Sequence, residues 1–319
     1  MVNMITKKYH DATTDEISND RISLGNNYAH LDGDGGYSAL SSRSAPLGFA
    51  TEAEITNSRL LLQDPYAHLD EDEISGFGAL SHPAFLQIEK KKGRYSIDEI
   101  EQQARNLQKI MWKNRHKIWP NIASPKPISI LDPIVAFGLI GFDCDTEQNL
   151  GEFTIDGKLI EVAGLIDITS RKARISSQFK PNIQRFTAAH ELGHAMMHIV
   201  TGLHRDKPLD GITKSREYKE FEADKFATFF LMPTKLLRLT FKRHFLTEEF
   251  AINEATALAL GSDNYLELKK KCNTLRALSR MIAGATRFNG RHFDSLATQF
   301  GVSIEAMAIR LEELDLLSI

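Results

Sequence analysis

Residues 186–199 contain the pattern H-E-x-x-H, formed by His190, Glu191 and His194. Apolar residues from Phe186 to Ile199 recur around the pattern, which predicts a buried helix. Residues four apart on a helix differ by about 40° around its axis and lie one above the other. The rings of His190 and His194 are therefore expected to face the same side. With 11 histidines among 319 residues, chance would give such a pattern only about 0.03 times per chain.

A second acidic cluster downstream offers a third metal ligand. Glu220, Glu222 and Asp224 open another apolar stretch, which ends at Pro233. A catalytic zinc ion takes three protein ligands and keeps one position for water. We choose Glu220, because Asp224 lies four residues later on the same helix face, where it can hydrogen-bond a ligand imidazole. Glu222 points about 200° away from Glu220 and remains the alternative ligand.

These residue types predict a zinc-dependent peptide hydrolase with His190, His194 and Glu220 as ligands. Zinc lowers the pKa of its bound water toward about 7, and Glu191 accepts the proton as general base. The hydroxide then attacks a carbonyl polarised by the ion, and Glu191 protonates the leaving amine. The competing interpretation is a non-catalytic binding protein with a structural metal.

Other polar residues near the motif are assigned supporting roles. His198 has drifted about 80° around the helix from His190, so a supporting or core role is favoured over coordination. His204, Arg185 and Tyr218 are candidates for stabilising the oxyanion, and nothing in their spacing chooses among them.

The first 87 residues differ from the remainder of the chain. They hold 5 basic against 13 acidic residues and lack sustained periodicity, which favours disorder and argues against nucleic-acid binding there. Residues 16–32 nevertheless repeat at 54–70. The repeats are either a pair of partner-docking motifs or a duplication within a tolerant tail. A third interpretation has His30 or His68 occupying the metal site as an inhibitory ligand.

Further elements are predicted between the head and the motif. Ser96 and Glu99 form a capping box, which starts an amphipathic helix that ends before Pro120. Residues 132–142 start a second helix, and residues 161–168 and 173–179 form a β-hairpin. The longest apolar run, 133–142, is too short to span a bilayer, and the start has no signal peptide, so a cytoplasmic location without membrane partners is expected.

The C-terminal residues 293–317 are predicted to form two short helices. Gly301 marks the turn and Ser303 caps the second helix, as in a helix-turn-helix. The second helix offers only Arg310 as a basic side chain, while Glu312 and Glu313 would face phosphates unfavourably. Packing or substrate recognition is therefore favoured over direct DNA binding.

The motifs together resemble the ImmA/IrrE family of metallopeptidases. The resemblance is carried by RFTAAHELGH at 185–194, EFEADKFA at 220–227, LMP at 231–233 and AGLID at 163–167, and it covers roughly residues 95–317. It implies two histidines and a downstream glutamate as zinc ligands and the motif glutamate as catalytic. It also implies a helix-turn-helix transcriptional regulator or an antitoxin as the protein substrate, in a role in transcription regulation. The acidic repeated head departs from the family.

The sequence thus predicts a mainly helical α+β protein with a zincin-like fold and a small β-sheet. Residues 1–93 are expected to be an acidic region of low order, 94–240 the metallopeptidase domain, and 241–319 a helical C-terminal subdomain. The expected activity is zinc-dependent, site-specific endoproteolysis of a regulatory protein.

Overall fold

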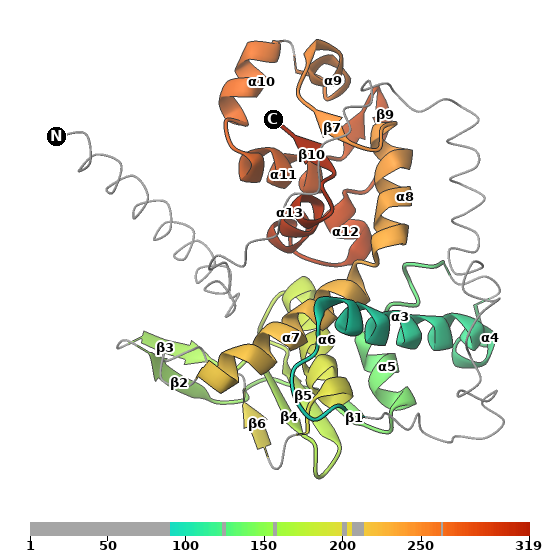
Figure 1. The fold of residues 1–319 in the computed structure, drawn as a ribbon, viewed down its shortest axis with the longest axis vertical. Helices are drawn as coiled ribbons and strands as arrows, with labels where there is room; N and C mark the ends of the chain where they lie inside the picture. Colours follow the sequence, from blue (N-terminus) through green and yellow to red (C-terminus); the bar gives the residue numbers. More distant parts are fainter. Residues whose placement is uncertain (1–89, 123–125, 156–157, 200–202, 206–213, 263) are drawn as a thin grey trace.

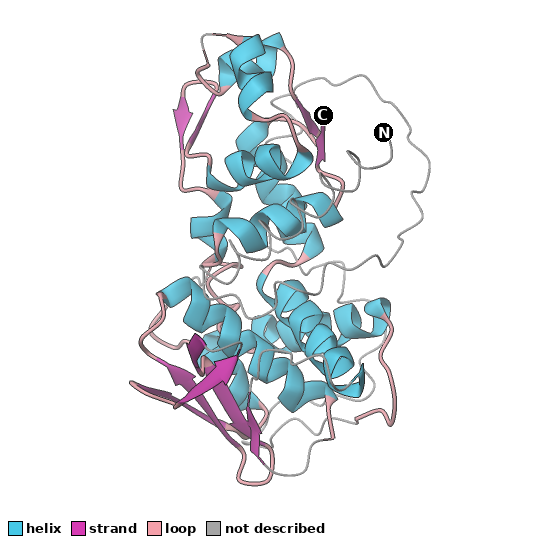
Figure 2. Cartoon of the chain, turned by 90° about the vertical axis from the view of Figure 1, so that its left-hand side faces the viewer, coloured by secondary structure: helices cyan, strands magenta, loops and turns pink. Residues whose placement is uncertain are grey.

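The computed structural model describes residues 90–122, 126–155, 158–199, 203–205, 214–262 and 264–319, which form two lobes (Figures 1 and 2). The lower lobe in Figure 1 holds the β-sheet and helices α3 to α7, and the upper lobe is mainly helical. The structure is mainly helical with small sheets, in agreement with the predicted α+β class. The repeats of the acidic head lie outside the described residues.

The first helices of the lower lobe follow their sequence signals. α3 (Ile97–Lys113) starts at the predicted capping box, in which Ser96 and Glu99 each accept from the other's backbone N–H. α4 (Arg115–Ile118) continues briefly toward Pro120. α5 (Pro133–Leu139) begins after Asp132, whose carboxylate accepts from the first free N–H groups of the helix. Both predicted helices are confirmed.

The sheet beside these helices has the strand order β1-β5-β4-β6. β4 (Gly164–Asp167) and β5 (Lys172–Ser176) form the predicted hairpin. β1 (Asp143–Glu147) pairs parallel with β5, and β6 (Leu203–Arg205) pairs antiparallel with β4. A separate hairpin joins β2 (Glu152–Ile155) to β3 (Lys158–Glu161), so the predicted first strand of the main hairpin starts three residues too early, at residue 161.

Two long helices carry the motif residues. α6 (Pro181–Met197) is buried over its second half and packs against the sheet, α5 and α7 (Lys214–Leu231). The sequence extended α6 to Ile199, but His198 has extended backbone angles and the Ile199 side chain is 54% exposed. α7 starts at residue 214, before the predicted start at Glu220. In both helices the errors concern the ends: apolar residues continue past the end of α6, and α7 begins with polar residues that lie before Glu220.

α8 (Thr234–Phe245) leads into the upper lobe and runs through residue 240, where the sequence placed a boundary. Three further helices follow: α9 (Glu254–Ala259), α10 (Tyr265–Lys271) and α11 (Leu275–Gly284). Short strands pair β7 (Phe250–Ala251) with β10 (Leu317–Ser318), and β8 (Arg287–Phe288) with β9 (Arg291–His292). Within the described part of the chain, no helix combines the length and apolarity needed to cross a bilayer.

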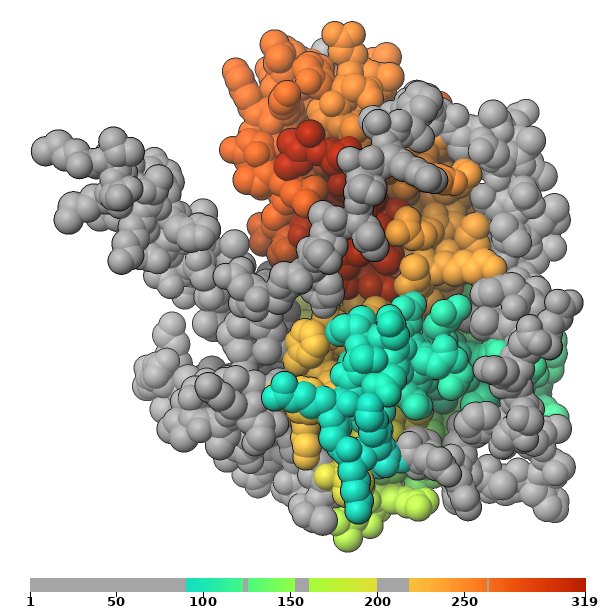
Figure 3. All heavy atoms as spheres, viewed as in Figure 1, coloured from blue at the N-terminus to red at the C-terminus, as the bar shows by residue number. Residues whose placement is uncertain are grey.

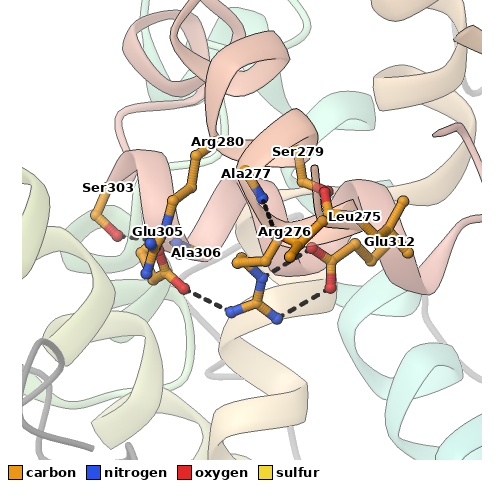
Figure 4. A network of polar contacts seen from close by, with 10 residues as sticks. Leu275, Arg276, Ala277, Ser279, Arg280, Ser303, Glu305, Ala306 and Glu312 are labelled. Carbon is orange, nitrogen blue, oxygen red and sulfur yellow. Dashed lines mark hydrogen bonds and ion pairs between the residues drawn. The ribbon is translucent and has the colours of Figure 1, made fainter. Parts of the chain in front are cut away.

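The chain ends in the predicted pair of short helices, α12 (Leu296–Phe300) and α13 (Ile304–Glu313). Gly301 joins them with φ 64°, a left-handed conformation that glycine adopts without strain. α13 packs against α11, and Figure 4 shows the ion pairs between them: Arg276 contacts Glu305 at 2.6 Å and Glu312 at 2.8 Å. The acidic residues of α13 thus have partners inside the protein.

Candidate metal centre

Three side chains that the sequence selected meet between α6 and α7. His190 Nε2 lies 3.0 Å from His194 Nε2, and Glu220 Oε2 lies 3.2 Å from the first nitrogen and 3.5 Å from the second. All three residues are buried. A tetrahedral zinc ion with bonds of about 2.0–2.1 Å separates its ligand atoms by roughly 3.3 Å. The three donor atoms therefore have the mutual spacing and chemical types that such an ion requires.

The close approach of α6 and α7 brings Glu220 to the histidines. Gly193 lies where the two helices touch: a Cβ on this residue would be 3.0 Å from Ala223 Cα and 3.1 Å from the Ala223 carbonyl oxygen. Side chains of ordinary size would keep the helix axes about 8–10 Å apart or further. The glycine inside the motif thus allows α7 to place its acidic residues over α6.

Asp224 fixes the orientation of the first imidazole, as predicted. Its carboxylate oxygen lies 2.8 Å from His190 Nδ1. An ionised carboxylate only accepts hydrogen bonds, so Nδ1 carries the proton and donates it. The lone pair of His190 Nε2 then points toward His194 and Glu220.

Glu191 is fully buried and packs against β4. A Cβ placed on Gly164 would lie 2.6 Å from Glu191 Oε1 and 2.6 Å from Thr187 Cγ2. The strand therefore needs a glycine where the carboxylate passes it. In the sequence Gly164 belongs only to the AGLID segment of the family resemblance, and its close contact with Glu191 is visible in the structure alone.

Glu222 and His198 lie behind the three donor atoms. His198 Nδ1 is 2.8 Å from His194 Nδ1, and His198 Nε2 is 2.8 Å from Glu222 Oε2. The other Glu222 oxygen accepts the backbone N–H of Tyr95. Helical phasing along α7 could not predict the hydrogen bond between Glu222 and His198, because His198 lies at the end of a different helix, α6. Burial, followed by the charge of His194, lowers the pKa of His198 to about 2, so this ring is neutral.

Two of the three oxyanion candidates, Arg185 and Tyr218, have described side chains. Arg185 donates to the Leu131 carbonyl and packs against Gly301, on the side of α12. Tyr218 stacks under the Arg94 guanidinium, and burial and the nearby Glu222 raise its phenol pKa. The side chain of His204 lies outside the described residues. The choice of an oxyanion-stabilising residue among the three stays a prediction.

Comparison with known proteins agrees with this site. The model of the IrrE N-terminal-like domain, a family of peptidases, matches residues 156–258, from the β2–β3 hairpin to α9. The match is shorter than the resemblance over residues 95–317 that the sequence indicated. Searches of curated proteins and of solved structures gave no match. The matched segment contains the H-E-x-x-H helix and the whole acidic cluster. Residues 156–258 are therefore similar to the IrrE N-terminal-like domain, in agreement with the sequence resemblance.

Proposed function

We propose that the protein is a zinc-dependent endopeptidase with a zincin-like catalytic domain. The observation that carries the proposal is the convergence of His190 Nε2, His194 Nε2 and Glu220 Oε2 at the edge lengths of a tetrahedral metal site. Three electron-pair donors in a buried space repel one another unless a proton or a metal cation lies between them. Two imidazoles and one carboxylate form the ligand set of a catalytic zinc site, which leaves one position for water.

The residues around the donors perform distinct tasks. Asp224 holds His190 in the tautomer that presents Nε2. When bound, zinc supplies Lewis acidity, which acidifies water and polarises a substrate carbonyl. Glu191, between the two histidines in sequence, accepts the proton from the attacking water and returns it to the leaving amine. Peptide hydrolysis by this route needs no nucleophilic side chain.

The proposed substrate is a helix-turn-helix transcriptional regulator or an antitoxin. The proposal rests on the resemblance to the ImmA/IrrE family and on the matching IrrE N-terminal-like domain. A regulator encoded beside the gene for this chain is the first candidate. Purified regulator is expected to be cleaved at one site by the full-length protein, and a chelator is expected to stop the cleavage. Mass spectrometry of the products would locate the cut.

Replacing Glu191 with glutamine tests the catalytic proposal. Glu191→Gln keeps the shape of the side chain but removes the base, so the cleavage rate is expected to fall by about 10²–10⁴-fold. Zinc affinity is expected to stay unchanged, because Glu191 is not among the three ligands. Rates from gel analysis and affinities from chelator competition give the two measurements. Undiminished cleavage by the variant would exclude Glu191 as the base, and binding of the regulator without cleavage by the wild type would favour a structural metal.

A further inference from the structure

A chain of hydrogen bonds leads from the candidate metal centre to the segment before α3. His194 Nδ1 contacts His198 Nδ1, His198 Nε2 contacts Glu222, and Glu222 accepts the N–H of Tyr95. The side chains of His198 and Glu222 are 3% and 1% exposed, so bulk water has little access to these contacts. Burying a carboxylate and an imidazole is costly unless each is hydrogen-bonded. The chain satisfies both groups.

The order of the partners fixes the direction of the hydrogen bonds. A carboxylate accepts, so Glu222 takes the proton on His198 Nε2. A neutral imidazole with a proton on Nε2 has a lone pair on Nδ1, which accepts from His194 Nδ1–H. His194 then carries its own lone pair on Nε2, the atom that faces His190 and Glu220. With Glu222 ionised and His198 neutral, each donor in this chain meets an acceptor when His194 presents its Nε2 lone pair for a cation.

We propose that His198 and Glu222 are positioning residues of the metal centre, which hold His194 in its metal-binding tautomer and orientation. The inference rests on the proposed zinc site. In this arrangement the two ligand histidines are oriented in different ways. His190 is oriented directly by a carboxylate, Asp224, whereas His194 is oriented through a second imidazole that passes on the effect of Glu222.

The segment before α3 becomes part of the centre in this arrangement. Tyr95 anchors Glu222 through its backbone, and Lys90 Nζ donates to the His198 carbonyl at 2.8 Å. Figure 3 shows this segment and α3 in blue-green on the surface beside α7. Because His198 ends α6 with extended backbone angles, its ring is not held by helical packing alone. The contacts from Lys90 and Glu222 hold the residue at the point where the helix stops.

Two substitutions of His198 test whether this residue orients His194 or only fills space in the interior. His198→Asn places an amide oxygen near the former Nδ1, where it can still accept from His194, whereas His198→Phe removes this acceptor. Both variants leave Glu222 without its imidazole partner, so both lose that contribution to stability. His244→Phe is the matched control, since His244 is also buried and hydrogen-bonded, but its partner is Gln299 in the upper lobe.

Zinc affinity of the full-length variants is to be measured by chelator competition, together with the visible spectrum of each cobalt-loaded protein and the melting temperature of each metal-free protein. His198→Phe is expected to bind zinc about 10–100-fold more weakly than the wild type and to alter the cobalt spectrum. His198→Asn is expected to keep the affinity within about threefold of the wild type. Glu222→Gln, which retains an acceptor but loses the charge, is expected to lie between them, and His244→Phe to match the wild type.

The inference is overturned if His198→Phe binds zinc as tightly as the wild type, or if the Asn and Phe variants lose affinity equally. A fall in melting temperature alone, with unchanged metal affinity and cobalt spectrum, would also overturn it, because a residue that only fills the interior gives that result. If the wild-type protein itself binds neither zinc nor cobalt, the proposed function fails instead. Glu222→Gln keeps the test decisive if the aromatic variant does not fold.

Discussion

Gly164 is the residue on which the placement of the proposed general base depends. Its missing side chain leaves room for the Glu191 carboxylate and the Thr187 methyl group against β4. The Thr187 methyl cannot rotate away freely, because β-branched side chains on a helix have restricted rotamers. A side chain at position 164 therefore moves the carboxylate.

Gly164→Ala is accordingly expected to lower kcat by about 10²-fold through misplacement of Glu191. Zinc affinity should remain that of the wild type, because the three atoms nearest to a Cβ at position 164 belong to Glu191 and Thr187 and not to the proposed ligands. Steady-state kinetics on the cleaved regulator and chelator competition give the two quantities. An unchanged kcat would mean that catalysis does not depend on the position of Glu191 seen in the structure.

His244 gives a second prediction at this scale, for the pH dependence of stability. Burial, followed by the charge of Arg243, lowers its pKa to about 4, and its Nε2 accepts a hydrogen bond from Gln299. In the unfolded chain the ring protonates near pH 6.5. The unfolded state therefore binds the proton first as the pH falls, which favours unfolding.

The free energy of unfolding is expected to decrease between about pH 6.5 and pH 4, by on the order of 3 kcal/mol from this group. His244→Gln keeps an acceptor for Gln299 and does not titrate, so the variant should lose less stability over the same interval. Urea unfolding at pH 7 and pH 4.5 measures the difference. Parallel losses in both proteins would contradict the prediction.

At the scale of elements, the contact between α6 and α7 creates the candidate site. Helix propensity alone would favour alanine over glycine at position 193 by about 1 kcal/mol. The atoms that a Cβ would meet there at 3.0–3.1 Å belong mainly to the Ala223 backbone, which cannot rotate away. Overpacking costs about 1–3 kcal/mol, so the steric effect exceeds the gain in propensity.

Gly193→Ala is therefore expected to lower the free energy of unfolding. It is also expected to weaken zinc binding, because the added methyl group would push α7, and with it Glu220, away from the histidines. Gly138→Ala in α5 is the control, because nothing lies within 4 Å of its added Cβ and only the propensity gain remains. Chemical denaturation and chelator competition on both variants test the pair. The prediction fails if the two substitutions have the same effect on zinc affinity.

For the whole molecule, α13 connects the C-terminal helices to the lobe with the metal centre. Arg310 is 3% exposed and donates to the Met232 carbonyl, the Thr234 hydroxyl and the Glu313 carboxylate. Lys225 of α7 pairs with the same glutamate. The only basic side chain of the second helix is thus committed to packing within the protein.

Arg310→Ala is expected to cost about 1–3 kcal/mol of stability, because it removes the buried guanidinium and leaves the Met232 carbonyl and the Thr234 hydroxyl without this donor. Arg291→Ala, at an exposed position of β9, should change stability by less than about 0.5 kcal/mol. Urea unfolding of both variants measures the contrast. A small effect of Arg310→Ala would show that the contact between α13 and the α7–α8 junction contributes little to the fold.

The sequence predicted those parts of the fold that local signals control. The capping box at Ser96, the hairpin of β4 and β5 and the turn at Gly301 are all found near their predicted positions. The end of α6 was wrong, because apolar residues continue to Ile199 although the backbone turns extended at His198. The side-chain direction predicted for His198 assumed helical geometry, but α6 ends at the preceding residue, Met197.

The sequence by itself determined which donor atoms are available: the spacing of His190 and His194 places both rings on one face of any helix, and Asp224 follows Glu220 by one turn. Only the tertiary structure decided between Glu220 and Glu222 as the acid facing both histidines, and only it joined Glu222 to His198 and Tyr95. The reason is physical. Periodicity describes a helix relative to its own axis, whereas the distance between α6 and α7 depends on the side chains packed between them.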